Sequence, residues 1–553
     1  MLNPTACFTL FSQPINNIPL PDKFTFPFYY QPHELSVLAS SQLQEELKLH
    51  LPYDENSSID DGKMFGVLVV KNQQQQVGFL AAFSGQIDGL ETDIQFVPHV
   101  SSMALQDVSY LKESKIINDI NAQIAELENS EHIKSLQISL NADTQKFEQQ
   151  LHAQQLIMQA NRKERKKQRS EIAEQANSKQ DKALHDLAKQ SIEDKKHYQA
   201  IKDSWQDKIA KQQNALNTLN DEIKHLKKRR KTLSKNLQKQ LFAKYQFLNA
   251  QQQIKDLNAI FAELPEHTPP SGAGDCAAPK LLQYAFKNNL APIAMAEFWW
   301  GAAPKSAVRQ HKNYYPSCYS KCQPILSHML QGLNIEDNPL LVNPAQGKEL
   351  PIVYQDDDIV IVNKPAEFLS VPGVNVEDSV YLRIQTQFPH ATGPLIVHRL
   401  DMSTSGLLVV ALNKRAHKSL QKQFIARTID KRYIALVDGI VKGDSGKVEL
   451  PLRLDFDDKP RQLVCNTKGK PALTTWHVLE RKENMTRLQL YPKTGRTHQL
   501  RVHCAHHLGL NMPIIGDTHY GKKANRLHLH AEHLALDHPI THKRLAFTIA
   551  PDF

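Results

Sequence analysis

The chain has 553 residues, of which 67 are Lys or Arg and 58 are Asp or Glu, so its formal net charge is +9. A chain of this length is expected to hold more than one domain, and its positive charge favours a polyanionic partner without requiring one. Six cysteines without regular spacing argue against a disulfide framework and indicate reduced thiols. No stretch approaches about 18 uninterrupted apolar residues, and no N-terminal segment is typical of a secretion signal. We therefore expect a soluble, cytoplasmic protein without a membrane partner.

The first 104 residues mix short apolar runs with prolines. Residues 64–70 and 77–82 are the clearest of these runs, and their length and composition are typical of strands. We expect residues 1–104 to be one part of a small α+β domain.

Residues 105–264 contain neither Gly nor Pro and are rich in Ala, Gln, Glu, Lys and Leu, which predicts long helices. Apolar residues recur there at steps of three and four, as in a coiled coil: Ile117, Ile120, Ile124, Leu127, then Leu216, Leu219, Ile223, Leu226, Leu233 and Leu237. The most economical arrangement is an antiparallel hairpin with arms of roughly 70 residues, on the order of 100 Å long. The chain should reverse near residues 175–186.

Two basic runs, 162–169 and 227–231, lie on this predicted hairpin. They could bind the phosphates of a nucleic acid, although a charge run is commonly just a solvated helix face. The alternative use of the hairpin is self-association through its apolar seam.

Residues 265–343 are expected to complete the α+β domain from which the hairpin protrudes. They hold Cys276, Cys318 and Cys322, with His311 or His328 nearby, which form a weak candidate metal site because zinc binds thiolate and imidazole. Buried free cysteines are the common alternative. A second enzymatic centre around Asp275 and Cys276 is a more remote one.

The most informative stretch is His-Arg-Leu-Asp-Met-Ser-Thr-Ser-Gly at 398–406, directly before the apolar run 407–411. It places a carboxylate, Asp401, between a basic residue and a Thr-Ser-Gly turn, at the edge of a predicted buried strand. Folds usually display functional groups at such positions. Taken alone, Asp401 could instead cap the turn that contains Thr404.

Three further segments accompany this motif. Residues 358–365 read as a strand that ends in a turn, residues 431–439 read as a strand with Tyr433 on one face, and residues 493–503 carry Arg496 and Leu500. Together the four segments resemble the RluA family of RNA pseudouridine synthases, over about residues 350–553. We therefore expect a catalytic domain at 344–553. Residues 450–452 and 469–472 most resemble the branch that modifies both a large-subunit ribosomal RNA hairpin and a transfer RNA anticodon stem-loop.

The resemblance implies a fold and an activity. The fold is a mainly antiparallel mixed sheet with flanking helices, so the whole chain is expected to be α+β, with an α+β N-terminal domain interrupted by the helical hairpin. The activity is an isomerisation of uridines in ribosomal RNA or transfer RNA. It moves the ribose C1′ from uracil N1 to C5 and needs neither a redox carrier nor an energy source, so no cofactor is expected.

The resemblance also assigns roles to residues. Asp401 is the catalytic carboxylate, acting as nucleophile or base, and Arg496 is its basic partner. Tyr433 completes the catalytic set by stacking on the uracil. Arg399, Leu500 and Thr404 are expected to bind the substrate, and Arg399 enters the RNA in place of the flipped base. For His398 we favour a structural role.

Two alternatives to an isomerase remain at this level. One is a catalytically idle RNA-binding or ribosome-assembly factor that keeps the frame of the enzyme. The other is a bifunctional protein with a further activity in residues 265–343. The joint presence of Asp401, Tyr433 and Arg496 favours the enzyme.

Overall fold

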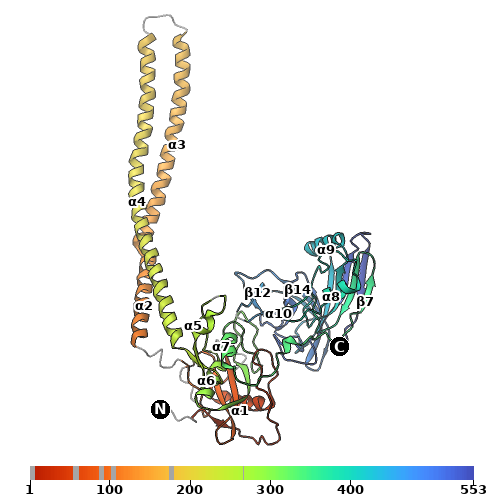
Figure 1. Cartoon of the computed structure of the whole chain (residues 1–553). Helices are drawn as coiled ribbons and strands as arrows, with labels where there is room; N and C mark the ends of the chain where they lie inside the picture. The colour runs from red at the N-terminus through yellow and green to blue at the C-terminus, as the bar shows by residue number, and fades with distance from the viewer. Residues whose placement is uncertain are drawn as a thin grey trace. The chain divides into compact units, whose positions relative to one another are not determined.

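The computed structural model describes residues 6–53, 62–85, 87, 92–100, 108–173, 180–265, 267–456 and 458–553 (Figure 1). Its contacts divide the chain into two compact units, one made of residues 1–101 and 245–553 and the other of residues 102–244. In the described part of the chain, no helix is both long enough and apolar enough to cross a membrane.

The unit of residues 102–244 is a hairpin of long helices (Figure 1). One arm consists of α2 (Val108–Asn129) and α3 (Glu131–Ala173), and the other is α4 (Gln180–Lys244). Ion pairs between the arms show that they are antiparallel. From Glu128–Lys227 through Asp143–Lys208 to Arg165–Asp194, the residue number rises on the first arm and falls on the second. Of the predicted reversal at 175–186, residues 175–179 lie outside the described residues and the rest belongs to α4.

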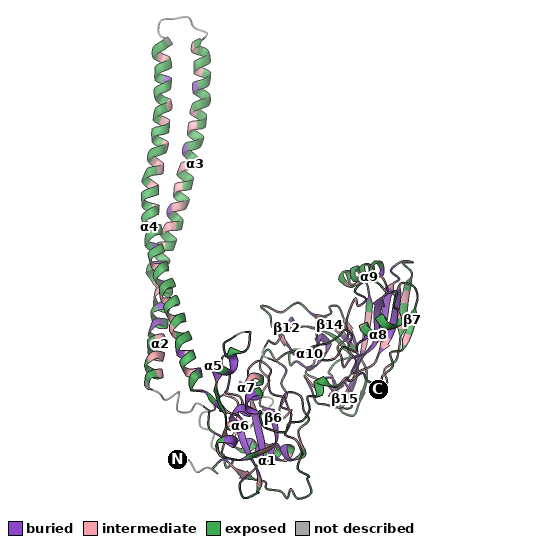
Figure 2. Ribbon diagram, viewed as in Figure 1, coloured by how far each residue is buried: buried purple, intermediate pink, exposed green. Residues whose placement is uncertain are grey.

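Apolar residues at the predicted spacing hold the two arms together. Ile120, Ile124 and Ile133 pack with Leu216 and Ile223, while most of the remaining surface of the hairpin is exposed (Figure 2). Ser130 separates α2 from α3, and its Oγ accepts a hydrogen bond from Ile133 N at 3.2 Å, as a helix N-cap does.

The expected helix as far as residue 264 is wrong, because α4 ends at Lys244. The chain continues as a small hairpin of β4 (Gln246–Leu248) and β5 (Ile254–Asp256), followed by α5 (Leu257–Ala262). Tyr245 and Phe247 are buried in the other unit. Burial of these rings outweighs the helix propensity of a segment without Gly or Pro.

The N-terminal part of the first unit is built on a four-stranded sheet in the order β1-β3-β2-β6. Its strands are β1 (Thr9–Leu10), β2 (Lys63–Lys71), β3 (Val77–Phe83) and β6 (Ala291–Trp300). Strand β6, which follows the helical hairpin in sequence, pairs antiparallel with β2, which precedes it. Strands from both flanks of the hairpin therefore lie in one sheet.

Helices cover both faces of this sheet. Val67 and Val69 of β2 pack with α1 (Glu34–His50), whereas a side chain at Gly66 would point at Ala277 and Leu281 of α6 (Ala277–Lys287). This alternation is the expected two-residue period of a strand. Helix α7 (Cys322–Met329) contacts α6, and the turn η1 (Pro339–Leu341) follows it.

The C-terminal part contains a nine-stranded sheet in the described residues, in the order β11-β14-β15-β10-β16-β9-β8-β7, with β17 paired to β16. Its strands are β7 (Ile352–Gln355), β8 (Ile359–Lys364), β9 (Ser405–Ala411), β10 (Asp430–Asp438), β11 (Ser445–Glu449), β14 (Leu473–Lys482), β15 (Met485–Pro492), β16 (Leu529–Asp537) and β17 (Arg544–Thr548). A separate hairpin is formed by β12 (Leu452–Leu454) and β13 (Gln462–Val464). The helices are α8 (Val380–Gln387), α9 (Lys414–Ala426) and α10 (Gln499–Ala505). All pairings in the large sheet are antiparallel except β9 with β16, which confirms the mainly antiparallel mixed sheet.

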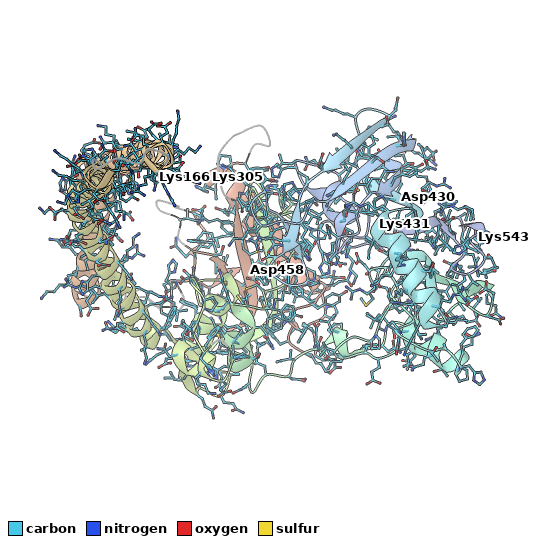
Figure 3. All side chains as sticks on the ribbon, turned by 90° about the horizontal axis from the view of Figure 1, so that it is seen from above. Lys166, Lys305, Asp430, Lys431, Asp458 and Lys543 are labelled. Carbon is cyan, nitrogen blue, oxygen red and sulfur yellow. The ribbon has the colours of Figure 1, made fainter. Side chains whose placement is uncertain are left out.

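Direct contacts join the two parts of the first unit. Arg309 forms an ion pair with Asp458 at 2.7 Å (Asp458 is labelled in Figure 3), and Asn313 Nδ2 donates to the carbonyl of Gly521 at 2.6 Å. The backbone N–H of Val464 donates to Ser306. The ion pair and both hydrogen bonds come from the segment 306–313, which follows β6.

Candidate active site

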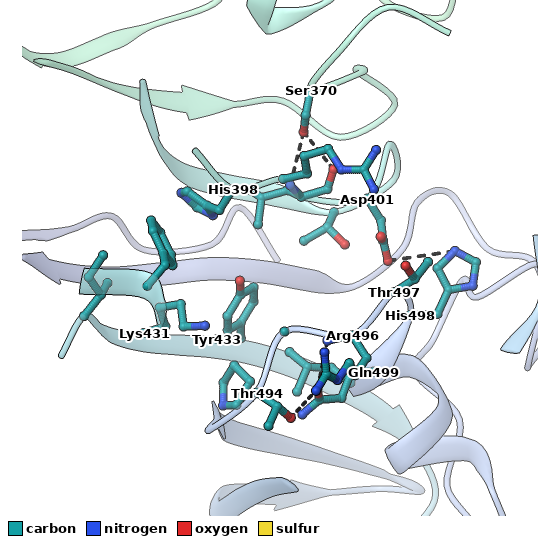
Figure 4. A pocket seen from close by; sticks show the side chains of 18 of the residues that line it. Ser370, His398, Asp401, Lys431, Tyr433, Thr494, Arg496, Thr497, His498 and Gln499 are labelled. Carbon is teal, nitrogen blue, oxygen red and sulfur yellow. Dashed lines mark hydrogen bonds and ion pairs between the residues drawn. The ribbon is translucent and has the colours of Figure 1, made fainter. Parts of the chain in front are cut away.

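A cavity of about 1240 Å³ opens in the C-terminal part of the chain. It is lined by residues of the 398–406 motif, by the start of β10 and by the segment leading into α10 (Figure 4). All six site residues expected from the sequence lie on its wall: Arg399, Asp401, Thr404, Tyr433, Arg496 and Leu500.

The loop that carries Asp401 is tied down on both sides. Ser370 Oγ donates to the carbonyl of Leu400 at 2.7 Å and accepts from its N–H at 3.1 Å. The buried Lys364 donates through Nζ to the carbonyls of Met402, Pro365 and Phe368. Burial lowers the pKa of Lys364 to about 7, while three acceptors match the three donors of its ammonium form. The sequence motif did not reveal this positioning role of Lys364 and Ser370.

Gly406 ends the motif for a steric reason. Its φ is +113°, and a Cβ atom there would lie 2.4 Å from the carbonyl oxygen of Ala531 on β16. Only glycine fits such a backbone conformation and approach. The close parallel pairing of β9 with β16 thereby fixes the start of the buried strand β9, and the loop that carries Asp401 directly precedes this strand.

Asp401 combines partial burial with access from the cavity. Its side chain is 29% exposed, and its Oδ2 lies 3.7 Å from Nη1 of Arg501. Burial raises the pKa of Asp401, whereas the charges of Arg501 and Lys364 act in the opposite direction. The carboxylate therefore has cationic partners that stabilise its charged form.

The arginine beside Asp401 is Arg501, not Arg496, which corrects the expectation from the sequence. Arg496 is partly exposed on the cavity wall, and its Nε donates to the carbonyl of Pro471 at 3.1 Å. Arg501 lies inside α10 with a side chain only 5% exposed, and it binds both carboxylate oxygens of the buried Asp517 at 2.7 and 2.8 Å. Burial would raise the pKa of Asp517, but Arg501 outweighs it and holds that pKa below its usual range.

The reason for the difference lies in the turn before α10. His498 adopts a left-handed conformation, with φ at +52°, and the helix begins at the next residue. Arg496 therefore stays in the turn, while Arg501 projects from the helix towards Asp517 and Asp401. Only the fold reveals that Asp517, farther along the chain, holds Arg501 in place.

Tyr433 and Leu500 form the apolar side of the cavity. Burial, and to a lesser extent the charge of Asp401, raise the pKa of Tyr433 above its usual range, so its hydroxyl stays protonated. Leu500 is 7% exposed. It lies on α10.

His498 is a polar neighbour of Asp401 that the sequence analysis missed. Its Nε2 lies 4.0 Å from Asp401 Oδ2, and its Nδ1 lies 2.8 Å from the hydroxyl of Tyr520. That hydroxyl accepts a hydrogen bond from Gln462 N, so we assign it as the donor to Nδ1. Nδ1 is then the acceptor, and the hydrogen of the ring lies on Nε2, which faces Asp401. Burial, then the charge of Arg501, lowers the pKa of His498 well below its usual value. The ring is therefore neutral.

The two residues before Leu400 differ sharply. His398 accepts through Nε2 from Val409 N at 3.2 Å, and burial, then the charge of Lys431, lowers its pKa to about 3. These contacts support the structural role favoured from the sequence. Arg399 is exposed on the cavity wall, and among the described residues its guanidinium has neither a hydrogen-bond nor an ion-pair partner.

These features describe a cavity that presents a carboxylate beside a buried arginine. Residues 358–506 match the family model described as RNA pseudouridylate synthase. The chain is 47% identical over 219 residues to the dual-specificity RNA pseudouridine synthase RluA of Escherichia coli (strain K12), which covers 38% of this chain and 97% of that protein. It is 45% identical over 218 residues to RluA of Pasteurella multocida, with the same shares.

A solved structure, human RNA Pseudouridylate Synthase Domain Containing 1, is 30% identical, covers 38% of this chain and 87% of that chain, and has a TM-score of 0.33. The matches to the family model and to the RluA proteins define the class as RNA-modifying isomerases. The chain belongs to the RluA family of RNA pseudouridine synthases, and it converts uridine in RNA to pseudouridine.

Proposed function

We propose that this chain modifies uridines in stem-loop RNA, namely a large-subunit ribosomal RNA hairpin and a transfer RNA anticodon stem-loop. The observation that carries this proposal is the convergence of Asp401, Tyr433 and Arg501 on one cavity. The relatives' description as dual-specificity enzymes supports two classes of substrate. A catalytically idle RNA-binding factor is disfavoured, because it has no use for a reactive carboxylate beside a buried arginine.

In this proposal Asp401 supplies the reactive carboxylate. The bond between ribose C1′ and uracil N1 breaks, a bond between C1′ and C5 forms, and the hydrogen of C5 is replaced by one on N1. Atoms and electrons balance without a co-reactant. Arg501, held by Asp517, favours the ionised form of Asp401 and directs it at the cavity.

The other cavity residues bind and shield the base. Tyr433 offers a ring that stacks on uracil and a protonated hydroxyl that donates a hydrogen bond. Leu500 excludes water from the reacting atoms. Thr404, which is 3% exposed, helps to shape the turn beside Asp401 and contacts the substrate. Arg496 binds the RNA from the rim of the cavity.

The rim of the cavity suits an RNA backbone. Cationic side chains on its wall outnumber acidic ones and include Arg399, Arg427, Lys431, Lys493 and Arg496 (Lys431 and Arg496 are labelled in Figure 4). Phosphate contacts of this kind supply sequence-independent affinity and fix the orientation of the RNA. The flipped uridine can then enter the cavity.

Arg399 is the residue that we propose takes the place of the flipped base. Flipping costs a few kcal/mol in a paired or stacked context and less when the base is already unstacked. Arg399→Ala is therefore expected to reduce kcat/KM by roughly 100-fold, or about 3 kcal/mol, on a stem-loop, but only a few-fold on a single strand with the same target sequence. Steady-state kinetics on the two RNAs measure this difference. Equal losses on both would assign Arg399 another role.

The RNA targets can be identified directly. Pseudouridine is mapped at nucleotide resolution in total RNA from cells with and without this protein. The proposal predicts that sites in large-subunit ribosomal RNA and in an anticodon stem-loop disappear together and return when the chain is supplied. Loss at neither class of RNA would contradict it.

We also propose a division of labour along the chain: an N-terminal α+β domain formed by 1–101 and 245–343, a hairpin of residues 102–244 that assists RNA binding, and a catalytic domain at 344–553. The basic runs at 162–169 and 227–231 are largely exposed, although Arg165 is paired with Asp194. Self-association is the alternative, and it would have to use apolar residues outside the seam, such as Ile138, Leu156 and Ile192, which are exposed.

Replacing residues 109–243 by a short Gly/Ser linker distinguishes RNA binding by the hairpin from self-association. The replacement stops before Lys244 because Tyr245 and Phe247 belong to the core of the other unit. Turnover of a minimal stem-loop is expected to persist, whereas affinity for a long ribosomal RNA fragment and the slope of that affinity against salt should both fall. An unchanged salt slope, together with a change from dimer to monomer in light scattering, would instead establish self-association.

A further inference from the structure

Three cysteines from two separate segments meet in the N-terminal part of the chain, outside the cavity. The Sγ atoms of Cys276, Cys318 and Cys322 all lie within 4.8 Å of one another. Cys276 immediately precedes α6, and Cys322 is the first residue of α7. Cys322 is buried, and the other two are partly buried.

This spacing fits a single tetrahedral metal ion. With Zn–S bonds of about 2.3 Å, the sulfurs of a tetrahedral site are separated by about 3.8 Å. An iron–sulfur cluster needs wider spacing, because its several metal atoms separate the ligands further. The three thiols are free, but because they lie within 4.8 Å of one another, a disulfide between two of them is the main competing state.

Contacts other than those between the sulfurs hold the two cysteine-bearing segments in place. Glu297 of β6 is 3% exposed, and its carboxylate accepts hydrogen bonds from Ser317 Oγ at 2.5 Å and from Ala278 N at 3.3 Å. Ser317 is adjacent to Cys318, and Ala278 is two residues after Cys276. One buried carboxylate thus braces both segments that carry the cysteines.

Two helix starts lie at the same place. Cys276 is the N-cap of α6 and makes no side-chain hydrogen bond to the helix, and the residue before Cys322 makes none to α7. The positive ends of the two helices stabilise negative charge on nearby sulfur. The two helix ends therefore offset part of the cost of placing negative charge on these buried sulfurs.

The histidines considered from the sequence lie outside this group. His311 Nδ1 accepts from Gly301 N at 3.0 Å, and His328 Nε2 contacts the carbonyl of Phe247 at 3.0 Å. Within the part of the chain that the structure describes, no fourth His, Cys, Asp or Glu atom joins the three sulfurs at that spacing. A metal ion here has one position for water or an added ligand.

We propose that Cys276, Cys318 and Cys322 bind one Zn²⁺ ion through three thiolates and a fourth, exchangeable ligand. The ion links the segment before α6 to the start of α7. It is structural in effect, because it cross-links the start of α6, which packs on the four-stranded sheet, to the start of α7, which packs on α6.

The full-length chain, purified without chelators, is expected to contain one zinc per chain by elemental analysis. Co²⁺ added to the metal-free chain should produce thiolate charge-transfer absorption and the visible bands of a tetrahedral ion. Each of Cys276→Ser, Cys318→Ser and Cys322→Ser should weaken Zn²⁺ binding by at least about tenfold, since even loss of a partner outside the ligand set costs that much.

Cys7→Ser and Cys465→Ser are the matched controls, because these cysteines lie outside the group, and both variants should keep the zinc. Circular dichroism verifies that each variant is folded. The Co²⁺ spectrum is recorded on the unaltered chain, so it tests metal binding even if one of the serine variants fails to fold. A metal-free chain that neither takes up Zn²⁺ nor gives the Co²⁺ spectrum under reducing conditions would overturn the proposal. Iron with acid-labile sulfide, or a Cys318–Cys322 disulfide found by mass spectrometry in the purified chain, would overturn it equally.

Discussion

Asp401→Asn is expected to abolish pseudouridine formation, with a loss of more than about 1000-fold, because an amide is neither a nucleophile nor a base at this position. The change preserves the shape of the side chain. RNA affinity should stay within a few-fold, since it rests on phosphate contacts around the cavity rim. Release of tritium from RNA labelled at uracil C5 measures turnover, because the reaction removes that hydrogen, and fluorescence anisotropy measures binding.

Asp438→Asn is the control for this variant. Asp438 lies on the same strand as Tyr433 but does not line the cavity, and it is paired with Lys522 at the surface. Its replacement should leave turnover unchanged. Measurable turnover by a clean Asp401→Asn preparation would contradict the mechanism, and loss of RNA binding would show that Asp401 serves the fold instead.

Arg501→Met is expected to remove both activity and much of the stability. It leaves Asp517 buried with no cation, and breaking a buried ion pair in this way costs about 3–5 kcal/mol. It also removes the charge 3.7 Å from Asp401 that favours the ionised carboxylate. Urea unfolding and single-turnover kinetics measure the two effects. Arg496→Met, the comparison, should mainly raise KM, because Arg496 lies partly exposed on the rim and does not contact Asp401.

The double variant Arg501→Met with Asp517→Leu separates catalysis from folding. It removes the stranded carboxylate, so stability should largely return. Activity should not return, because Asp401 still lacks its partner. If the double variant were as active as the unaltered chain, Arg501 would be only a structural residue; if Arg496→Met abolished turnover in a folded protein, Arg496 would be the partner after all.

Much of the candidate site could be predicted from the sequence. Residues such as Asp401 and Tyr433 belong to motifs whose local pattern is specific, and they all line one cavity. The choice between Arg496 and Arg501 could not be made, because it depends on where α10 begins and on a carboxylate, Asp517, farther along the chain. The positioning roles of Lys364 and Ser370 were hidden for the same reason: the groups that they hold in the Asp401 loop are backbone atoms of Met402 and Leu400, which lie far from them in the sequence.

In the fold, too, features set by neighbouring residues could be predicted, and features set by residues far apart in the sequence could not. Period and composition predict the helices of the hairpin, since i, i+3 and i, i+4 spacing is a local property. The end of α4 at Lys244 depends instead on tertiary burial of Tyr245 and Phe247. The meeting of Cys276 with Cys318 and Cys322 likewise follows from how α6 and α7 pack, which no spacing in the chain specifies.

The pairing of β2 with β6 has a consequence for synthesis of this protein on the ribosome. Strand β2 must wait, with one edge unpaired, until β6 has emerged, and an unpaired apolar edge can bind another nascent chain. Closing a loop of roughly 200 flexible residues costs about 1 kcal/mol more than closing one of roughly 70. The intervening helices form from local contacts, which are fast, and their antiparallel pairing brings their ends together. We therefore expect that early folding of the hairpin shortens the period in which nascent chains are prone to misassembly.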